Sequence, residues 1–288
     1  MKRILVPTDF SEQAGFAMDL ACQIASKTKS ELVVLHVLDY TGLFDYSAGS
    51  SAYPLMGNVA GLELDQEFMD TLYRNAEEKC EKFLKNYQTD NLKITTKIKF
   101  GSAFQFITAE VTEEKTDLVI MGSKGSGGFE EVLIGSNTEK VVRHARCPVL
   151  TVKSEIYVEN IKSIVFATSF KEEDSHVAEE VKKLQEVFEA NLHLVRVNTP
   201  NNFETNRSIM EKANKFIKEN KLTNYTINIY SDKVEEDGII FFAQDINADL
   251  IALATHGRSG ILHLLSGSIA EDVVNHAKRP VWTFRLKH

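Results

Sequence analysis

The sequence predicts an α/β protein with two tandem doubly wound sheets, each of five parallel strands with helices on both faces. Short apolar runs alternate with amphipathic stretches along the whole chain, which is typical of parallel strands joined by helices. The second half of the chain repeats the first. The 288 residues, of which 43% are hydrophobic and 26% charged, suffice for two globular domains of about 150 residues each.

The repeat is visible at two different offsets. A shift of 132 positions aligns residues 117–149 with 249–281, and 14 of these 33 pairs are identical. A shift of 160 positions instead aligns the first apolar run of each half. The two offsets differ by 28, which indicates that the first copy carries about 28 extra residues, an inserted segment near 39–66. We therefore expect a first copy at residues 1–153 and a second copy at residues 160–288.

Each copy is expected to contain five strands and four helices. The apolar runs of the first copy predict strands at Ile4–Thr8, Glu31–Leu38, Leu92–Phe100, Leu118–Gly122 and Val149–Val152. The amphipathic stretches between them predict helices near Ser11–Lys27, Gln66–Tyr87, Ala103–Glu114 and Ser136–Ala145. The second copy repeats the strands at Ser163–Thr168, Leu192–Val197, Tyr225–Tyr230, Leu250–Ala254 and Val281–Phe284. In such sheets ligands bind at the carboxyl ends of the strands, so function is expected on the loops after the first, second and fourth strands.

The loop after the fourth strand of the first copy is rich in glycine. It reads Gly122-Ser123-Lys124-Gly125 and, after nine intervening residues, Gly135-Ser136-Asn137 at the start of a helix. Glycine lets a phosphate approach the backbone without a Cβ in the way, and the free amides of a helix start attract anions. This spacing therefore predicts a cradle for a polyphosphate. The alternative is a plain turn in which Ser136 serves only as the helix N-cap.

The second copy keeps this signature only in part. Ala254 stands where the first copy has Gly122, and Ser169 stands where the first copy has Asp9 at the end of its first strand. We therefore expect one strong site, in the first copy. A weaker second site is left open, formed by His256, Gly257, Arg258, Gly267 and Ser268.

With this signature the sequence resembles the universal stress protein family in its tandem form, over essentially the whole chain. The resemblance implies the adenine-nucleotide alpha-hydrolase-like fold and the binding of ATP, ADP or AMP. It implies a phosphate end formed by Gly122, Ser123, Gly125, Gly135, Ser136 and Asn137, and a nucleoside end formed by Thr8 and Asp9, with Val37 beside the base. Lys124 is a further candidate, because a lysine in this loop could neutralise a phosphate.

Asp9 follows the first strand, where a carboxylate either caps the next helix or meets a ligand. Ser11 is better placed for the cap. Asp9 is therefore expected to bind the nucleotide directly or through a magnesium ion. The charged run Lys171–Asp174, near the matching position of the second copy, is expected to be a solvated helix face.

The resemblance also bears on assembly, because single-domain relatives pair through their last strands. It implies that Val281–Phe284 of the second copy lies beside Val149–Val152 of the first. Two linked copies could satisfy this pairing alone, and a homodimer of tandem chains is equally consistent with it. The inserted segment, which is rich in tyrosine and other apolar residues, is expected to fold over the nucleotide or to meet a protein partner of unknown identity.

Composition and charge argue against several other classes. The 33 basic and 41 acidic residues give a formal net charge of -8, which disfavours binding to nucleic acid or to an anionic membrane mainly by charge. No apolar run approaches the roughly 18 residues of a membrane span and no signal peptide is evident, so we expect a soluble, cytoplasmic protein. Three widely spaced cysteines and scattered histidines lack the spacing of a disulfide framework or a zinc site.

The leading hypothesis is an ATP-binding protein of stress response or signalling, whose nucleotide state tunes its assembly or its partners. No catalytic residue is assigned. Asp9 is the one acidic candidate near the phosphates, so hydrolysis would be slow or incidental. The alternatives are a slow ATPase or an ATP-using enzyme of a related nucleotide-binding α/β fold, and a nucleotide-free scaffold or binder of another small ligand.

Overall fold

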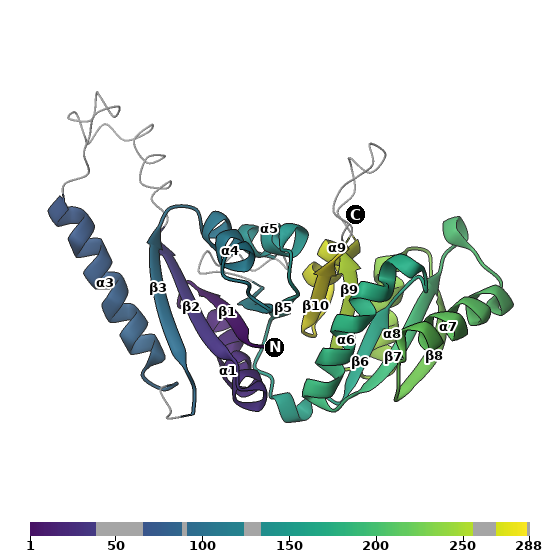
Figure 1. Ribbon diagram of the computed structural model, residues 1–288. Coiled ribbons are helices and arrows are strands. Elements are labelled where there is room, and N and C mark those ends of the chain that lie inside the picture. The colour runs from purple at the N-terminus through teal and green to yellow at the C-terminus, as the bar shows by residue number, and fades with distance from the viewer. Residues whose placement is uncertain (39–65, 88–90, 124–133, 256–268, 287–288) are drawn as a thin grey trace, which may run out of the picture.

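The computed structural model describes residues 1–38, 66–87, 91–123, 134–255 and 269–286. In the first copy strands and helices alternate in the expected order (Figure 1). The elements are β1 (Arg3–Thr8), α1 (Glu12–Thr28), β2 (Glu31–Leu38), α3 (Gln66–Leu84), β3 (Ile94–Phe100), α4 (Ala103–Thr112), β4 (Leu118–Gly122), α5 (Ser136–His144) and β5 (Val149–Val152).

The second copy repeats this order after the short 3-10 turn η3 (Val158–Asn160). Its elements are β6 (Ser163–Ala167), η4 (Glu172–Asp174), α6 (Ser175–Phe188), β7 (Asn191–Asn198), η5 (Pro200–Asn202), α7 (Asn206–Asn220), β8 (Tyr225–Ser231), α8 (Glu235–Asp245), β9 (Leu250–Thr255), α9 (Ile269–His276) and β10 (Val281–Arg285). Within the described residues each copy thus has five strands and four α-helices, as the sequence predicts.

All ten strands form one sheet, in the order β3-β2-β1-β4-β5-β10-β9-β6-β7-β8. Neighbouring strands within each copy are parallel, and their order is that of a doubly wound sheet. The two copies meet at β5 and β10, which pair antiparallel with Trp282 opposite Leu150. This confirms the pairing expected for the last strands, and it makes the two five-stranded sheets continuous (Figure 1).

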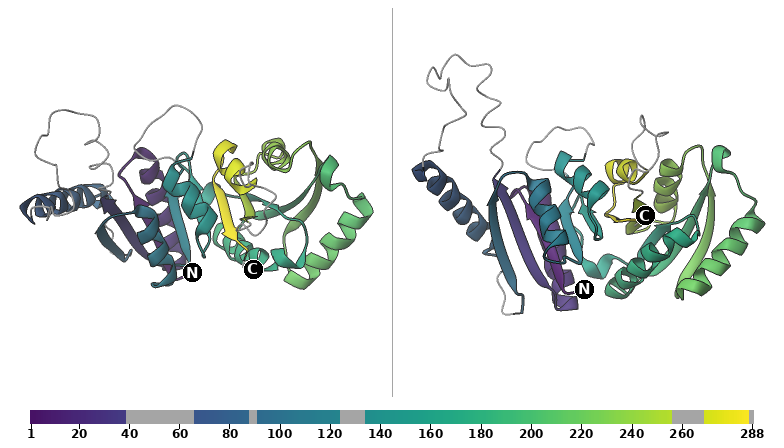
Figure 2. Two further views of the ribbon diagram at one scale, coloured as in Figure 1. Left: turned by 90° about the horizontal axis from the view of Figure 1, so that it is seen from above. Right: turned by 45° about the horizontal axis from the view of Figure 1, so that its top comes forward.

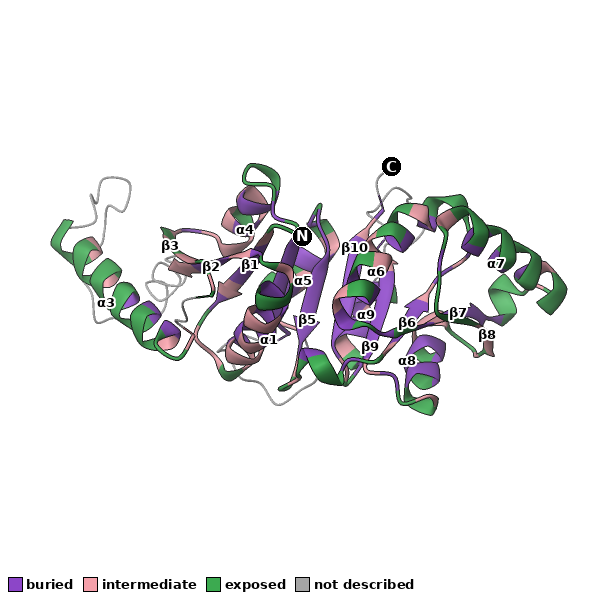
Figure 3. Ribbon diagram, turned by 60° about the horizontal axis from the view of Figure 1, so that its bottom comes forward, coloured by how far each residue is buried: buried purple, intermediate pink, exposed green. Residues whose placement is uncertain are grey.

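Helices cover both faces of this sheet (Figure 2). Helices α1, α3, α6 and α7 contribute to the core on one face, and α4, α5, α8 and α9 to the core on the other. Side chains alternate between these faces along a strand, so Leu32 and Val34 of β2 join the first core whereas Val33 and Leu35 join the second. The central strands are accordingly buried, and the outer sides of the helices are exposed (Figure 3).

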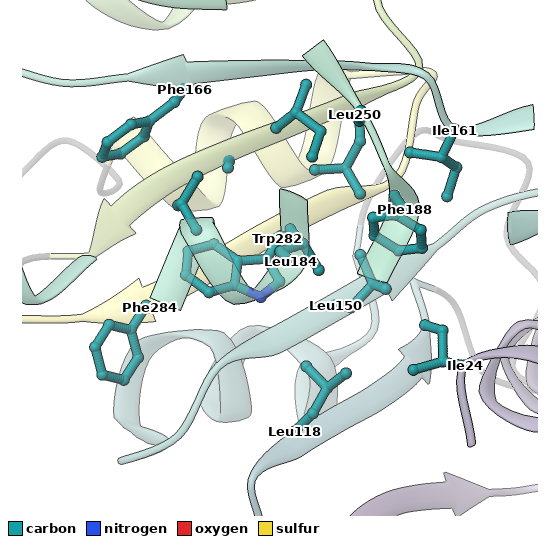
Figure 4. Packing of buried hydrophobic residues seen from close by; sticks show 14 of the residues in the cluster. Ile24, Leu118, Leu150, Ile161, Phe166, Leu184, Phe188, Leu250, Trp282 and Phe284 are labelled. Atoms are coloured by element: carbon teal, nitrogen blue, oxygen red, sulfur yellow. The ribbon is translucent and has the colours of Figure 1, made fainter. Parts of the chain in front are cut away.

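The core on the α1 and α6 face runs through the junction between the copies. Trp282 of β10, which is 1% exposed, belongs to one cluster with Leu150 of β5 and Ile24 of α1. Phe188 of α6 and Phe166 of β6 belong to the same cluster (Figure 4). The two copies therefore share one apolar core as well as one sheet.

The element boundaries differ from the expected ones by at most a few residues. Strand β3 begins at Ile94 and not at Leu92, because its partner β2 begins at Glu31 and the ladder starts with Leu32 opposite Ile94. Ser11 precedes α1 as its N-cap, with its hydroxyl accepting a hydrogen bond from the amide of Ala14. None of the helices that the structure describes combines the length and the apolar character needed to cross a membrane.

Candidate functional site

The carboxyl ends of β1, β2 and β4 lie side by side at one edge of the first copy (Figure 1). Thr8 of β1 lies opposite His36 of β2. On the other side β1 pairs with β4, with Ile4 opposite Leu118 and Leu5 opposite Val119. The chain leaves β1 for one face of the sheet and β4 for the other. This edge is therefore the point at which the winding reverses, where such sheets bind ligands.

The turn after β1 is held together by its own side chains. The amide of Phe10 donates to Thr8 Oγ1 at 3.0 Å, and the amide of Ser11 donates to Asp9 Oδ1 at 3.0 Å. Phe10 adopts a φ of 64°, a left-handed conformation that turns the chain into α1. The side chain of Thr8 is buried, whereas Asp9 is exposed. Asp9 thus presents a carboxylate at the end of the strand, while Ser11 caps α1 as predicted.

His36 is a neighbour of this site that sequence reasoning missed. Its Nδ1 donates to the carbonyl oxygen of Thr8 at 2.8 Å, and its ring packs on the Phe10 ring with the centroids 4.4 Å apart. Burial lowers the pKa of His36, and the charge of Lys79 lowers it further; the bond to Thr8 and the charge of Asp9 act in the opposite sense. The available signal was a single polar residue within the apolar run of β2.

Gly122 ends β4 and packs closely against the start of α1. A Cβ at Gly122 would lie 2.8 Å from the Cβ of Gln13 and 2.9 Å from its carbonyl carbon. Glycine is therefore needed here for the packing of α1, independently of any phosphate. Ser123 follows, 3% exposed, and its amide donates to the carbonyl of Val152 at 2.9 Å. The entry to the glycine-rich loop is thus fixed to β5.

Helix α5 begins at the exit of the same loop. Its N-cap is Gly135, and within the described residues no side-chain hydrogen bond caps the helix. Ser136 is the first residue of the helix, so the alternative in which it serves as the N-cap is wrong. Ser136 and Asn137 are both exposed. The uncapped amides of the first turn carry the positive end of the helix dipole, which favours an anion.

The start of α5 is tied to the end of β4. The amide of Gly135 donates to the carbonyl of Ser123 at 2.8 Å, and the hydroxyl of Thr138 donates to the carbonyl of Gly122 at 3.0 Å. The structure therefore brings Thr8, Asp9, Gly122, Ser123, Gly135, Ser136 and Asn137 to one edge of the sheet. Val37 is half-buried near the end of β2. Lys124, Gly125 and residues 39–65 of the inserted segment lie outside the described residues.

A buried carboxylate occupies the matching strand end of the second copy. Asp174 Oδ2 accepts hydrogen bonds from the Thr168 hydroxyl at 2.8 Å, the Ser169 amide at 2.9 Å and the Ser169 hydroxyl at 2.8 Å. Asp174 is 4% exposed, so the expectation that all of Lys171–Asp174 forms a solvated helix face is wrong for this residue. By the offset of 160 it corresponds to Ala14 of the first copy. The acid missing at Ser169 is thus replaced by one from the following turn, η4.

Arg196 stands in the second copy where the first has His36. It is 7% exposed, its Nη1 lies 3.6 Å from a carboxylate oxygen of Glu235, and its Nε has no hydrogen-bond partner among the residues that the structure describes. His256, Gly257, Arg258, Gly267 and Ser268 lie outside the described residues. The two copies therefore differ at both equivalent positions, with Asp9 and His36 in the first copy and Ser169 and Arg196 in the second.

A metal ion at the first site would depend on its ligand. Among the described residues no three or more His, Cys, Asp or Glu side chains are grouped to hold a metal ion. Magnesium is often held in proteins by one or two carboxylates together with phosphate oxygens and water. The exposed carboxylate of Asp9 fits that mode of binding, with the remaining oxygens supplied by a bound polyphosphate and by solvent.

Comparison with known proteins gives a consistent answer. The family model described as the Universal stress protein family matches residues 1–153 and 160–285. A universal stress protein of Methanocaldococcus jannaschii is 32% identical over 157 residues, which cover 53% of this chain and 94% of that protein. A universal stress protein of Synechocystis is 24% identical over 306 residues, which cover 99% of this chain and all of that protein, 100%.

Solved structures agree on the fold. A universal stress protein from Archaeoglobus fulgidus superposes with a TM-score of 0.74 at 20% identity, covering 99% of this chain and 96% of that one. A putative universal stress protein from Pseudomonas aeruginosa superposes with a TM-score of 0.64 at 19% identity, covering 99% and 94%. Because the family model matches nearly the whole chain in two consecutive segments, this chain belongs to the universal stress protein family, in a tandem form with two copies of the fold.

Proposed function

We propose that this protein binds one adenine nucleotide, ATP or its products ADP and AMP, at the carboxyl edge of the first copy, and that the nucleotide state tunes its assembly or partner binding in a stress response. The observation that carries the proposal is the start of α5, at which the described residues provide no side-chain cap. It lies at the exit of a glycine-rich loop and at the winding switch beside Thr8 and Asp9.

The phosphate end of the site would be the first turn of α5 with the glycine-rich loop. Ser136 offers a hydroxyl, and the amides of the first turn offer donors with the positive end of the helix dipole. The backbone at both ends of the loop is already fixed, by Ser123 bonded to Val152 and by Gly135 bonded to Ser123. A ligand therefore meets donors that are held in place before it binds, which reduces the entropic cost of binding.

The nucleoside end would be the turn after β1. Asp9 is exposed there and can accept a hydrogen bond from a ribose hydroxyl or hold a magnesium ion together with phosphate oxygens. Val37, half-buried near the end of β2, offers an apolar surface for the base. The first turn of α5 and the carboxylate of Asp9 together suit a ligand that is anionic at one end and carries hydroxyl donors at the other.

The second copy supports a single strong site. Its strand-end donors, the Thr168 hydroxyl and the Ser169 amide and hydroxyl, are already used by Asp174. A nucleotide would have to displace this buried carboxylate and also lie close to its negative charge. We therefore infer a stoichiometry of about one nucleotide per chain.

The proposal is tested by Ser136→Asp with Ser268→Asp as its matched control at the equivalent position of the second copy. An aspartate in the first turn of a helix interacts favourably with the helix dipole, so the fold is retained. Its charge repels a phosphate bound to the same turn, and we expect the Kd for ATP to rise at least about tenfold. Ser268→Asp should leave the Kd unchanged. Titration calorimetry with both variants decides this, and equal ATP affinity in wild type and Ser136→Asp contradicts the proposal.

Gly122 is a poor position for this test, although it belongs to the glycine signature. A Cβ at Gly122 collides with the backbone of Gln13, so a substitution there would weaken the fold and the ligand site together.

Turnover of ATP is measured with wild type, Ser136→Asp and Ser268→Asp by counting the phosphate released per site. Binding with little release supports a nucleotide-responsive protein, and many turnovers per site would identify an ATPase instead.

A further inference from the structure

The exit of the glycine-rich loop in the first copy is bonded to the second copy. The amide of Ile134, the residue just before the α5 N-cap, donates to Oδ1 of Asn275 at 2.8 Å. Asn275 lies on α9 and is 141 residues from Ile134 in the sequence. Helices α5 and α9 lie next to each other at the junction of the copies (Figure 1). A residue of the second copy thus contacts the backbone that leads into the candidate phosphate site.

Two further hydrogen bonds at the ends of this loop come from the first copy itself. Ser123, at the entry, donates to Val152, and Gly135, at the exit, donates back to Ser123. These bonds fix the two ends relative to β4 and β5. The bond from Ile134 fixes the exit relative to α9. Within the part of the chain that the structure describes, Asn275 is the residue of the second copy bonded to the loop exit.

Asn275 is itself held firmly in this position. Its backbone carbonyl accepts a hydrogen bond from Lys153 Nζ at 2.7 Å. One turn earlier on α9, Glu271 accepts from Arg143 Nε at 2.6 Å, and the same guanidinium also contacts Glu139 on its own helix. The side chain of Glu271 is 6% exposed. These contacts, together with the pairing of β5 with β10, fix α9 against α5.

The repeat shows that only one of the two equivalent residues can accept a hydrogen bond from such a loop amide. The offset of 132 makes Arg143 the equivalent of Asn275, and Arg143 pairs with two carboxylates. A guanidinium carries only donors, so it cannot accept a hydrogen bond from a backbone amide, whereas an asparagine amide oxygen can. The acceptor, Asn275 Oδ1, therefore lies in the second copy and binds the loop of the first copy. The first copy is also the one that has Asp9 at the end of its first strand.

We propose that Asn275 is a positioning residue for the nucleotide site of the first copy. It holds the exit of the glycine-rich loop through the Ile134 amide, so that the first turn of α5 faces the phosphates in a fixed orientation. The second copy then acts as a structural part of the first copy's site. The inference rests on the proposed function for its ligand, and on the structure alone for the bond.

The test compares full-length Asn275→Ala with Lys153→Met. Both changes remove a hydrogen bond across the same junction, but only Asn275→Ala removes the acceptor for Ile134. We expect Asn275→Ala to raise the Kd for ATP about fivefold, the effect of one lost neutral hydrogen bond, with Lys153→Met close to wild type. Equal ATP affinity in Asn275→Ala and wild type overturns the inference. An equal loss of ATP affinity in Asn275→Ala and Lys153→Met also overturns it, because the effect would then come from the junction as a whole.

Hydrogen exchange without nucleotide gives a second readout that does not depend on ligand binding. The Ile134 amide should exchange faster in Asn275→Ala than in wild type, and Asn275→Asp, which keeps an oxygen acceptor, should restore its protection. Unchanged exchange of this amide in Asn275→Ala overturns the inference. If wild type binds no adenine nucleotide, the proposed function fails, whereas the exchange result still decides whether Asn275 positions the loop.

Discussion

At the scale of single residues, the two copies use different side chains at equivalent strand ends. The first copy has Asp9 and His36, and the second has Ser169 and Arg196 with the buried Asp174. Sequence comparison of the copies reveals the exchange of Asp9 for Ser169, because both follow an apolar run of the same length. It does not reveal that Asp174 replaces the acid, since a charge within Lys171–Asp174 is typical of an exposed turn.

His36 makes the fold sensitive to acid. Its pKa is lowered in the folded protein, chiefly by burial, so the unfolded chain binds a proton more readily than the folded one. The contribution of His36 to the free energy of unfolding is therefore fully present above about pH 6.5, the pKa of histidine in an unfolded chain. It is lost as the pH falls below that value. We expect His36→Phe to reduce the slope of unfolding free energy against pH between about pH 6.5 and 5, measured by urea titration at each pH.

The control for this prediction is His176→Gln, at an exposed position on α6. The slope of unfolding free energy against pH should be the same in His176→Gln as in the wild type. A wild-type slope in His36→Phe as well would show that other groups dominate the acid response.

At the scale of elements, periodicity predicted the strands and helices well, with errors of at most three residues at their ends. Apolar runs identify β1, β2 and β4 because these strands are buried on both faces. The start of a helix depends on a local cap, which is why Ser11 could be assigned from the sequence. The start of α6, which comes later in its copy than the start of α1 does, could not be assigned from the sequence. The turn η4 that precedes α6 is held by hydrogen bonds from β6 to Asp174 and not by a helical pattern.

Asp174 should be important for the stability of this turn. Asp174→Ala leaves the buried Thr168 hydroxyl and the Ser169 amide without their acceptor, and we expect the unfolding free energy to fall by about 2 kcal/mol. Glu173→Ala is the matched control in the same turn, since Glu173 is exposed and makes one ion pair with Lys171 at 3.7 Å. It should change stability by less than about 0.5 kcal/mol. Equal stability of the two variants in urea unfolding would refute the role given to Asp174.

At the scale of the whole molecule, the repeat and its offsets predicted two doubly wound sheets, and family resemblance predicted that their last strands pair. The bonds that couple the copies were beyond sequence reasoning. Asn275 reaches Ile134, and Arg143 reaches Glu271, across more than a hundred residues. No local pattern marks such contacts, because they depend on how α5 and α9 come to lie side by side.

One continuous sheet and a shared core predict that the copies unfold together. Trp282 is the single tryptophan and lies at the junction, 1% exposed. We expect the transition seen by its fluorescence in urea to coincide with that seen by far-ultraviolet circular dichroism, which reports on both copies. Two separated transitions by circular dichroism would show that the copies are energetically independent.

We propose above all that this universal stress protein holds one adenine nucleotide, in its first copy. The most direct measurement is to denature purified protein and to count and identify the nucleotide released per chain, for wild type, Ser136→Asp and Ser268→Asp, with added ATP where the ligand is lost in purification. We predict about one adenine nucleotide per chain in wild type and Ser268→Asp, and little in Ser136→Asp. No nucleotide in any sample, together with no stabilisation by ATP, would contradict the claim, as would full occupancy in Ser136→Asp.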